Sequence, residues 1–336
     1  MQVLFLNPLE ERLRDFPARY LPAPEFEVRV AGADGALPAD LDNVQACVYW
    51  DHAIGRELIE RMPALRFIQR VGRYRSTGDL SAAFERGILV SSTPYGVLAR
   101  VAQHTLMLML ALARNLLPSH QGVLEGANKI GMAPEYAKER PVAFNWAGVE
   151  AIDSLFDKTL GIIGFGEAGS VLADLVRPFD MEVLYYKRRR LTPGQEYYYG
   201  VEYAELDELL ARSDYVTTFL PYTEENRGLL GEQEFGLMKQ GAFFVNTGRA
   251  NVTDETALIR ALKEGRLAGA GLDVFSLEPL PEDTPFRDLP NVVMTPHVAG
   301  GVGGWQDTFE RIARNLRLVR DGGLPVQQLT RDAFEL

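Results

Sequence analysis

A single glycine-rich turn constrains this chain more than any other feature of its sequence. Gly164, Gly166 and Gly169 have the spacing G-x-G-x-x-G, directly after the apolar run TLGII and before the helix-like VLADLVRPF. In such a strand–turn–helix unit, the first glycine permits a tight turn and the second lets a pyrophosphate approach the backbone. The third lets helix and strand pack closely. The pattern predicts a dinucleotide-binding βα turn, with the phosphates at the helix N-terminus; the alternative is a glycine-rich turn without a ligand.

Short β-like runs alternate with helical patterns on both sides of this turn. Before it, the strand candidates are QVLFLNP, EFEVRV, ACVYW, LRFIQRV and ILVSST, with helix-like segments such as IGRELIERM between them. From Thr159 a second series follows, with TLGIIGFG, MEVLYY, YVTTFLP, AFFVNTG, LAGAGLDVF and VVMTPHV. Such alternation predicts parallel sheets with crossover helices, and a chain of 336 residues has room for about two domains. We therefore expect an α/β fold with two doubly wound parallel-sheet domains, ending in an amphipathic helix over residues 305–320.

The segment between the two series begins with an apolar helix. Residues 99–117 are apolar nearly all round in the middle of the stretch, which predicts a helix buried between domains or subunits. Residues 118–158 are irregular and punctuated by Gly and Pro. They are too many for a plain connection, so the segment is either a functional loop or an oligomer arm.

Composition argues against several classes of protein. Asp and Glu outnumber Lys and Arg by 46 to 35, and a net charge of −11 disfavours nucleic-acid binding, which depends on clustered basic residues. The longest strongly apolar run, residues 105–113, is about half of a membrane span, and the N-terminus has no basic leader before its apolar stretch. The single Cys47 cannot form an internal disulfide. We expect a cytoplasmic protein with no membrane or nucleic-acid partner.

A basic cluster follows the strand candidate MEVLYY, where the glycine fingerprint normally continues. An acidic residue about 20 positions after the glycines usually bonds the adenosine ribose. This chain instead has Lys187 and Arg188, and Lys187 lies 18 residues beyond Gly169. Cationic side chains suit a 2′-phosphate better than a ribose diol. The cluster predicts NADP(H) as the preferred cofactor, and NAD(H) is the alternative if the basic run is only a solvated strand end.

Three further residues have chemistry that fits together. Arg249 follows the strand candidate AFFVNTG, Glu278 lies beyond LDVF, and His297 closes VVMTP. All three fall at or just past the carboxyl ends of strands, where open parallel sheets place their ligands. Near neutral pH, His is the usual proton donor to a carbonyl oxygen. A carboxylate bonded to the other nitrogen of the imidazole favours the protonated form of the ring. Arg binds a carboxylate with two parallel hydrogen bonds. Taken singly, each residue has a plainer structural interpretation, but their joint placement predicts an active site without a metal.

Together these segments resemble a known enzyme family. Over essentially its whole length, the chain is similar to the D-isomer-specific 2-hydroxyacid dehydrogenases. The matching segments are VAQHTLMLMLALAR (101–114), TLGIIGFGEAG (159–169), FFVNTGRANVTDETALIRAL (243–262), LAGAGLDVFSLEPL (267–280) and VVMTPHVAGG (292–301). The resemblance implies that Arg249 binds the substrate carboxylate, that Glu278 is the partner of the imidazole, and that His297 is the general acid/base.

The resemblance also implies how the chain is divided. It implies a Rossmann cofactor domain over residues 101–298, with the irregular arm at 118–158, inserted into a split flavodoxin-like substrate domain formed by residues 1–100 and 299–336. The active site would lie in the interdomain cleft, and a homodimer would form largely through the cofactor domains. Asp273 would contact the nicotinamide carboxamide. The residues expected to bind the cofactor are Gly164, Phe165, Gly166, Glu167, Ala168, Gly169, Lys187, Arg188, Pro221, Thr247, Gly248, Asp273 and His297.

The chain departs from the family where the substrate is expected. Family members usually carry a glycine-rich loop near residue 72, where backbone amides hold the substrate carboxylate, but here the loop reads RVGRYR over residues 70–75. We expect Arg73 and Tyr74 of this loop, with Arg100 and Arg249, to bind substrate. Arg73, Arg75 and Arg100 are more positive charge than one carboxylate needs, which suggests a second anionic group on the substrate. The alternative is that these arginines point outward or pair with Asp and Glu.

The sequence thus favours an NAD(P)-dependent oxidoreductase that interconverts a small 2-oxo acid and the D-2-hydroxy acid. A different class of function remains open, because relatives of this family serve as dinucleotide-sensing corepressors on the same fold. A formate-type dehydrogenase would require Gln in place of Glu278, so it is disfavoured.

Overall fold

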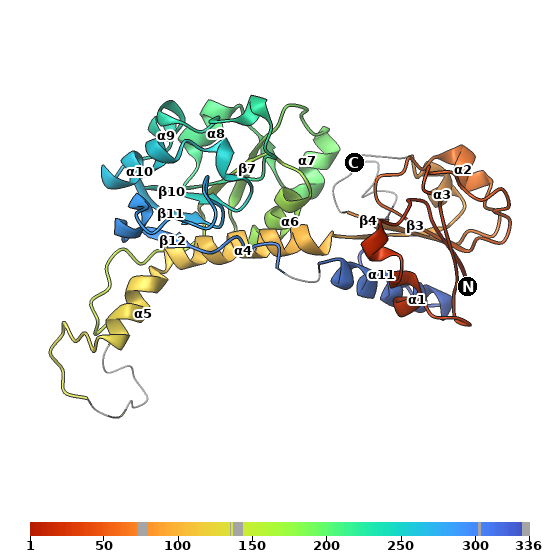
Figure 1. Cartoon of the computed structure of the whole chain (residues 1–336), viewed down its shortest axis with the longest axis horizontal. Coiled ribbons are helices and arrows are strands. Elements are labelled where there is room, and N and C mark those ends of the chain that lie inside the picture. Colours follow the sequence, from red (N-terminus) through yellow and green to blue (C-terminus); the bar gives the residue numbers. More distant parts are fainter. Residues whose placement is uncertain (73–78, 135, 137–143, 302–303, 331–336) are drawn as a thin grey trace.

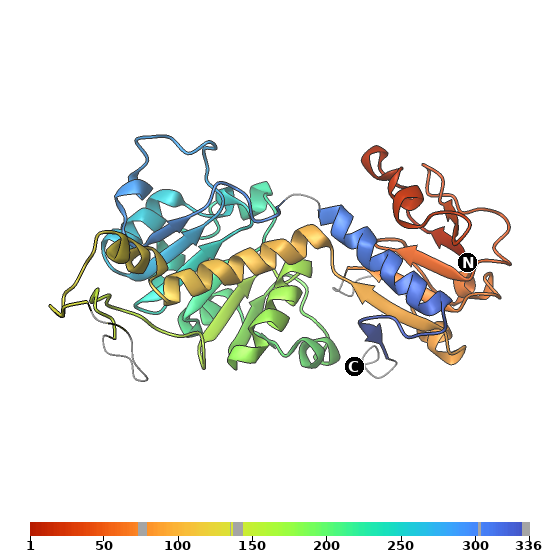
Figure 2. The same ribbon diagram turned by 90° about the horizontal axis from the view of Figure 1, so that it is seen from below.

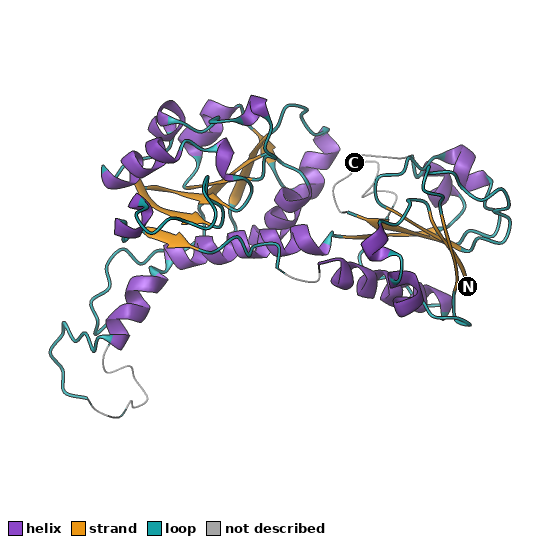
Figure 3. Ribbon diagram, viewed as in Figure 1, coloured by secondary structure: helices purple, strands orange, loops and turns teal. Residues whose placement is uncertain are grey.

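A computed structural model describes residues 1–72, 79–134, 136, 144–301 and 304–330 of the chain. Two β-sheets, each flanked by helices, form two lobes that lie side by side along the long axis of the molecule (Figures 1 and 3). This confirms the expected α/β fold with two doubly wound sheets. Both strand series appear where the sequence predicted them. Two short strands, β8 (Glu202–Tyr203) and β13 (Gln328–Leu329), were not predicted.

The first sheet has the order β13-β5-β4-β3-β1-β2, and all its pairs are parallel except β13 with β5. Its parallel strands are β1 (Gln2–Phe5), β2 (Glu27–Val30), β3 (Ala46–Tyr49), β4 (Phe67–Val71) and β5 (Leu89–Thr93). Helices α1 (Phe16–Tyr20), α2 (Arg56–Glu60), α3 (Ser81–Glu85) and α11 (Gly304–Arg320) accompany it. The central strands β3 and β4 are buried throughout, as strands covered on both faces should be.

The second sheet has the order β12-β11-β10-β9-β6-β7-β8 and is wholly parallel. Its longer strands are β6 (Thr159–Ile163), β7 (Glu182–Tyr186), β9 (Tyr215–Thr218), β10 (Ala242–Asn246), β11 (Leu267–Leu272) and β12 (Val292–Met294). Helices α6 (Glu167–Val176), α7 (Pro193–Tyr199), α8 (Leu206–Arg212), α9 (Glu232–Leu237) and α10 (Glu255–Lys263) connect them. The strand order reverses between β6 and β9, and ligands of such sheets bind at that point.

Short 3₁₀ helices lie between these strands and α-helices. They span Glu11–Leu13, Arg177–Phe179, Glu224–Asn226, Ala250–Val252 and Pro285–Asp288.

Two helices join the lobes. Helix α4 (Gly96–Ala113) leaves the first sheet after β5 and runs along the second lobe, beneath it in Figure 1 and in front of it in Figure 2. Helix α11 follows β12 and returns to the first sheet. They meet where Gly96 and Gly304 approach so closely that a Cβ on Gly96 would lie 2.1 Å from the carbonyl oxygen of Gly304. Beside this contact, Arg100 forms an ion pair with Asp307 at 2.6 Å. Only glycine permits this crossing of the two helices.

Helix α4 is also the one helix of the described residues that is long and apolar enough to cross a membrane. Its middle is instead packed against the second lobe, where Ala102, Leu108 and Met109 belong to a core cluster together with residues of β6 and α6. Burial in the fold therefore accounts for the apolar stretch that the sequence showed.

The arm differs from its prediction at the start. Residues 99–117 are not one helix, because Asn115 adopts the left-handed conformation with φ +47° and a second helix, α5 (Leu116–Leu124), begins after it. Residues 118–124 were expected to be irregular, and this expectation is wrong because they are part of α5. Helix α5 and the described residues 125–134 after it project away from the second sheet (Figure 1).

Candidate active site

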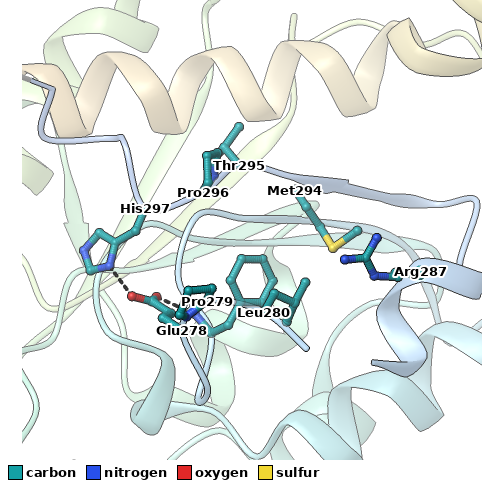
Figure 4. Close-up of a pocket in the computed structure, with 9 residues that line it drawn as sticks. Glu278, Pro279, Leu280, Arg287, Met294, Thr295, Pro296 and His297 are labelled. Atoms are coloured by element: carbon teal, nitrogen blue, oxygen red, sulfur yellow. Dashed lines mark hydrogen bonds and ion pairs between the residues drawn. The ribbon is translucent and has the colours of Figure 1, made fainter. Parts of the chain in front are cut away.

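The carboxyl ends of β11 and β12 bring together a histidine and a carboxylate. His297 follows β12 and Glu278 lies in the loop after β11, and Nδ1 of the imidazole is 2.7 Å from Oε2 of the carboxylate (Figure 4). The other carboxylate oxygen, Oε1, accepts a hydrogen bond from the backbone N–H of Phe275 at 2.9 Å. Two bonds on its two oxygens fix the carboxylate, and the carboxylate in turn orients the imidazole ring.

The charge state of Glu278 follows from these contacts. Burial alone would raise its pKa, but the hydrogen bonds from His297 and the Phe275 amide, with the charges of His297 and Arg249, bring the pKa below its usual value. Glu278 is therefore ionised near neutral pH.

The backbone around His297 is held by a second carboxylate, Asp273. This side chain is fully buried, and its Oδ1 accepts hydrogen bonds from the hydroxyl of Thr295 and the amide of Val298 at 2.6 and 2.9 Å. Its Oδ2 accepts from the amide of Ala299 at 2.8 Å. His297 itself has φ +53°, a conformation that costs a non-glycine residue about 1–3 kcal/mol and persists only where the surroundings enforce it. Asp273 thus fixes both flanks of a strained histidine.

His104 of α4 joins the same network. Its Nε2 lies 2.8 Å from the hydroxyl of Thr295 and 3.5 Å from Oδ1 of Asp273. No local pattern indicated that His104 and Thr295 act together, because they are 191 residues apart. A contact role for Asp273 with the nicotinamide stays a prediction, since the structure engages both its oxygens within the chain.

Arg249 lies on the same edge of the sheet, just after β10. Its side chain is exposed, Nη1 donates to the carbonyl of Gly248 at 2.7 Å, and its charge acts on Glu278. The predicted neighbours Thr247 and Gly248 also follow β10, and the Thr247 hydroxyl is 2.7 Å from the hydroxyl of Thr105 in α4. The three residues predicted for catalysis therefore share one edge of the second sheet.

A cavity of about 550 Å³ adjoins the imidazole and the carboxylate (Figure 4). Its walls are mostly apolar and come from two segments of the chain. The lining residues are Phe275, Glu278, Pro279, Leu280, Arg287, Met294, Thr295, Pro296 and His297. A low-polarity wall beside an ion pair strengthens the electrostatic interaction within it.

A second cavity, of about 590 Å³, lies over the glycine turn at the point where the strand order reverses. Gly164 has φ +89°, and a Cβ there would lie 3.0 Å from the amide nitrogen of Leu220, whereas Gly166 has open space around it. Helix α6 starts at Glu167, so the amides of its first turn have no acceptor within the helix. These features fit a dinucleotide pyrophosphate. The cavity is lined by predicted residues Gly164, Phe165, Gly166, Glu167, Ala168, Lys187, Arg188 and Pro221.

The far end of this cavity is basic. Lys187, Arg188 and Arg189 all line it, although Arg189 was not predicted as a cofactor ligand. Arg188 forms an exposed ion pair with Glu225 at 3.0 Å, from one wall of the cavity to the other. Exposed pairs of this kind are weak, so the guanidinium can exchange Glu225 for another anion.

The two lobes touch at the glycine turn. Oε1 of Glu167 accepts a hydrogen bond from the backbone N–H of Tyr95, which precedes α4, at 3.2 Å. Arg100, predicted to bind substrate, is engaged by Asp307 through Nε and Nη2, which is the alternative that the sequence left open. Arg73, Tyr74 and Arg75 lie outside the described residues. In the described part of the chain, no group of three or more His, Cys, Asp or Glu residues could hold a metal ion.

Comparisons with known proteins agree with this geometry. Residues 106–299 match the D-isomer specific 2-hydroxyacid dehydrogenase, NAD binding domain. Glyoxylate reductase of Pyrococcus furiosus is 34% identical over 93% of this chain and 91% of that protein. Glyoxylate/hydroxypyruvate reductase B of Enterobacter sp. (strain 638) is 39% identical over 72% of this chain and 70% of that protein. The crystal structure of a glyoxylate reductase from Paecilomyes thermophila has a TM-score of 0.56 and 28% identity over 98% of both chains.

Proposed function

The chain belongs to the D-isomer-specific 2-hydroxyacid dehydrogenase family and is an oxidoreductase, and we propose that it reduces a small 2-oxo acid to the D-2-hydroxy acid with NADPH. The observation that carries this proposal is the imidazole of His297 held 2.7 Å from the Glu278 carboxylate, on the same sheet as the glycine turn. The relatives named as glyoxylate reductases support the reaction class.

The roles proposed for the side chains follow from their contacts. Because Nδ1 of His297 is bonded to Glu278, Nε2 is the atom that delivers a proton to the substrate carbonyl oxygen. Arg249 is exposed at the same edge and binds the carboxylate of the substrate with its planar guanidinium. Asp273 holds the His297 backbone. When bound, the dinucleotide supplies the hydride, and the chain supplies position and charge.

The residues of the second cavity fit a nicotinamide dinucleotide, and we propose NADPH as the preferred form. The glycine turn would hold the pyrophosphate, and Lys187, Arg188 and Arg189 would hold the 2′-phosphate. The alternative is NAD(H), with the basic side chains in solvent. Cells generally keep NADPH reduced, so reduction is the working direction that we propose.

The arm supports a homodimer. Helix α5 and the segment after it expose large apolar side chains, among them Leu117, Leu124, Phe144 and Trp146. Large apolar side chains exposed on a projecting segment favour a contact with another chain. We propose that two copies associate through the arm and the cofactor domain. We keep the division into a substrate domain (1–100 and 299–336) and a cofactor domain (101–298), and a cytoplasmic location.

The substrate that we propose is a small 2-oxo acid with a second anionic group. The names of the relatives point to glyoxylate and hydroxypyruvate as the first compounds to test. The extra arginines of the loop after β4 point to a substrate with more negative charge than either. A corepressor-like, dinucleotide-sensing protein is not favoured, because the relatives are named as reductases and Arg249, Glu278 and His297 are all present.

A panel of 2-oxo acids assayed with NADH and NADPH in parallel tests the proposal. Turnover of glyoxylate, hydroxypyruvate or another 2-oxo acid, faster with NADPH, supports it. Dinucleotide binding without turnover of any 2-oxo acid would favour the regulatory alternative.

A further inference from the structure

Four basic residues follow β7, and their contacts divide them into two kinds. Residues 187–190 read KRRR. Arg190 donates from Nε and Nη2 to the two carboxylate oxygens of Glu196 in α7, at 2.8 and 3.1 Å, and its guanidinium lies 5.1 Å from the ring centre of Tyr203. The Glu196 side chain is only 14% exposed. A paired fork of this kind is strong and specific in its geometry, so Arg190 holds the loop in place.

Arg188 makes a weaker contact, on the side of the loop that faces the second cavity. Its Nη1 donates to Oε2 of Glu225 at 3.0 Å, and the two side chains are 85% and 77% exposed. Both residues line the cavity. Among the described residues, Glu225 is the one carboxylate that pairs with Arg188. A single exposed bond is worth little in water, so the guanidinium can give up Glu225 for a stronger anion.

The backbone that carries Glu225 is fixed, so only the side chain can move aside. Its 3₁₀ helix is capped by Thr223, whose hydroxyl oxygen accepts a hydrogen bond from the Asn226 amide at 3.2 Å. The neighbouring carboxylate, Glu224, pairs with Arg227 at 3.1 Å and is not among the residues that line the cavity. One short helix thus holds two carboxylates, of which only Glu225 reaches the basic end of the cavity.

An anion on Arg188 has to contend with Glu225. In the proposed function, Arg188 helps to hold the 2′-phosphate of NADPH. A phosphate that bonds to Nη1 takes the place of the Glu225 oxygen or lies beside it, and charges of the same sign at that distance repel each other even in water. NADH has no 2′-phosphate, so its binding leaves the ion pair in place. Glu225 therefore opposes one form of the cofactor and not the other.

We propose that Glu225 is a built-in competitor of the 2′-phosphate. Its carboxylate occupies Arg188 until the phosphate displaces it, and this exchange limits the preference of the chain for NADPH over NADH. The inference rests on the proposed function, from which it takes the NADPH site. It makes Glu225 a residue that sets cofactor selectivity through Arg188, without a part in the chemical step.

The test compares two ligands that differ in one phosphate. Isothermal titration calorimetry gives the affinities for adenosine 2′,5′-bisphosphate and for 5′-AMP, and their ratio isolates the 2′-phosphate. In E225Q this ratio should rise by about twofold to fivefold, because the competing exposed ion pair is lost. E225K should raise it further, since it adds a cation beside the phosphate. The matched control E224Q removes a charge from the same 3₁₀ helix and should leave the ratio unchanged.

A double-mutant cycle shows whether Glu225 acts through Arg188. On the R188M background, E225Q should change the ratio little, because no guanidinium is left to release. The full gain on that background, an unchanged ratio in both E225Q and E225K, or an equal gain in E224Q would overturn the inference. If the wild type binds both ligands equally and E225K separates them, the inference holds and the NADPH preference is wrong. If the ratios change as expected but no 2-oxo acid is reduced, only the proposed reaction is wrong.

Discussion

The carboxyl edges of the two sheets differ in how completely their charges are matched. On the second sheet, Asp273 accepts three hydrogen bonds at 2.6–2.9 Å, and Glu278 has a partner on each oxygen. On the first sheet, Arg70 is buried as deeply as a core side chain, yet its Nε has no partner among the described residues. The edge of the second sheet is assembled before any ligand arrives, whereas on the edge of the first sheet the described residues leave Nε of Arg70 unpaired.

This difference separates two kinds of residue. Side chains on the assembled edge should matter for every substrate, because they hold groups that act on the shared 2-oxo acid unit. Side chains on the incomplete edge should change which substrate is preferred. Substitutions test this distinction, and the largest losses of activity are expected for residues on the assembled edge of the second sheet.

The largest effect is expected for H297N, which keeps a polar side chain but removes the proton donor. Loss of a general acid typically lowers kcat by about 10²–10⁴-fold, and the loss should be similar for monoanionic and dianionic substrates. Steady-state kinetics gives kcat, and fluorescence titration with NADPH checks that the dinucleotide still binds. A variant that retains more than about a tenth of wild-type kcat would show that His297 is not the acid.

R249K should affect both binding and turnover. Lysine keeps the charge but loses the planar fork, so KM for the 2-oxo acid should rise and kcat should fall, by about tenfold to a hundredfold in kcat/KM. Measurement of both parameters at saturating cofactor decides the point. A change confined to the KM of the cofactor would place Arg249 outside the substrate site.

The order of strands and the position of the histidine and the carboxylate could be predicted from the sequence, because both depend on local patterns. Alternating apolar runs define the strands, and residues that follow strands meet at one edge of a parallel sheet. Glu278 and His297 are 19 residues apart, yet the prediction that they work together needed only this rule.

Contacts between distant segments could not be predicted. Arg100 was expected to bind substrate, but Asp307, which engages it, is 207 residues away and lies on a helix that returns from the other lobe. The bond of His104 to Thr295 and the left-handed turn at Asn115 that starts α5 depend in the same way on packing. A charge count for the loop after β4 suggested a second anion, but only the structure shows that Nε of Arg70 is buried without a partner among the described residues.

K187D tests the basic end of the cofactor cavity. Lys187 lines that end, and aspartate would repel a 2′-phosphate while accepting hydrogen bonds from a ribose diol. The wild type should prefer NADPH by about tenfold to a hundredfold in kcat/KM, less what solvent screening removes, and K187D should prefer NADH. Equal values for the two cofactors in the wild type, or higher values with NADH, would mean that Lys187 points into solvent.

The smallest effect is expected for E278Q, measured as a loss of kcat that depends on salt. The pKa of Glu278 lies below its usual value, so the carboxylate is charged at neutral pH. It lies 2.7 Å from Nδ1 of His297 and orients the ring whose Nε2 is proposed to deliver the proton. Glutamine keeps a side chain of the same size without the charge, so E278Q should lower kcat and leave the binding of the dinucleotide unchanged.

The size of the E278Q effect is limited by exposure. The side chains of His297 and Glu278 are 49% and 35% exposed, so solvent and salt screen the interaction, and we expect kcat to fall by less than about tenfold. High salt should shrink the difference between wild type and E278Q. The matched variant D273N should lower the Tm, and its kcat should not depend on salt in this way, because Asp273 acts on the His297 backbone and not on the ring nitrogen that Glu278 binds. An unchanged kcat in E278Q, or an equal response to salt in D273N, would mean that the two carboxylates do not divide the tasks of charge and position.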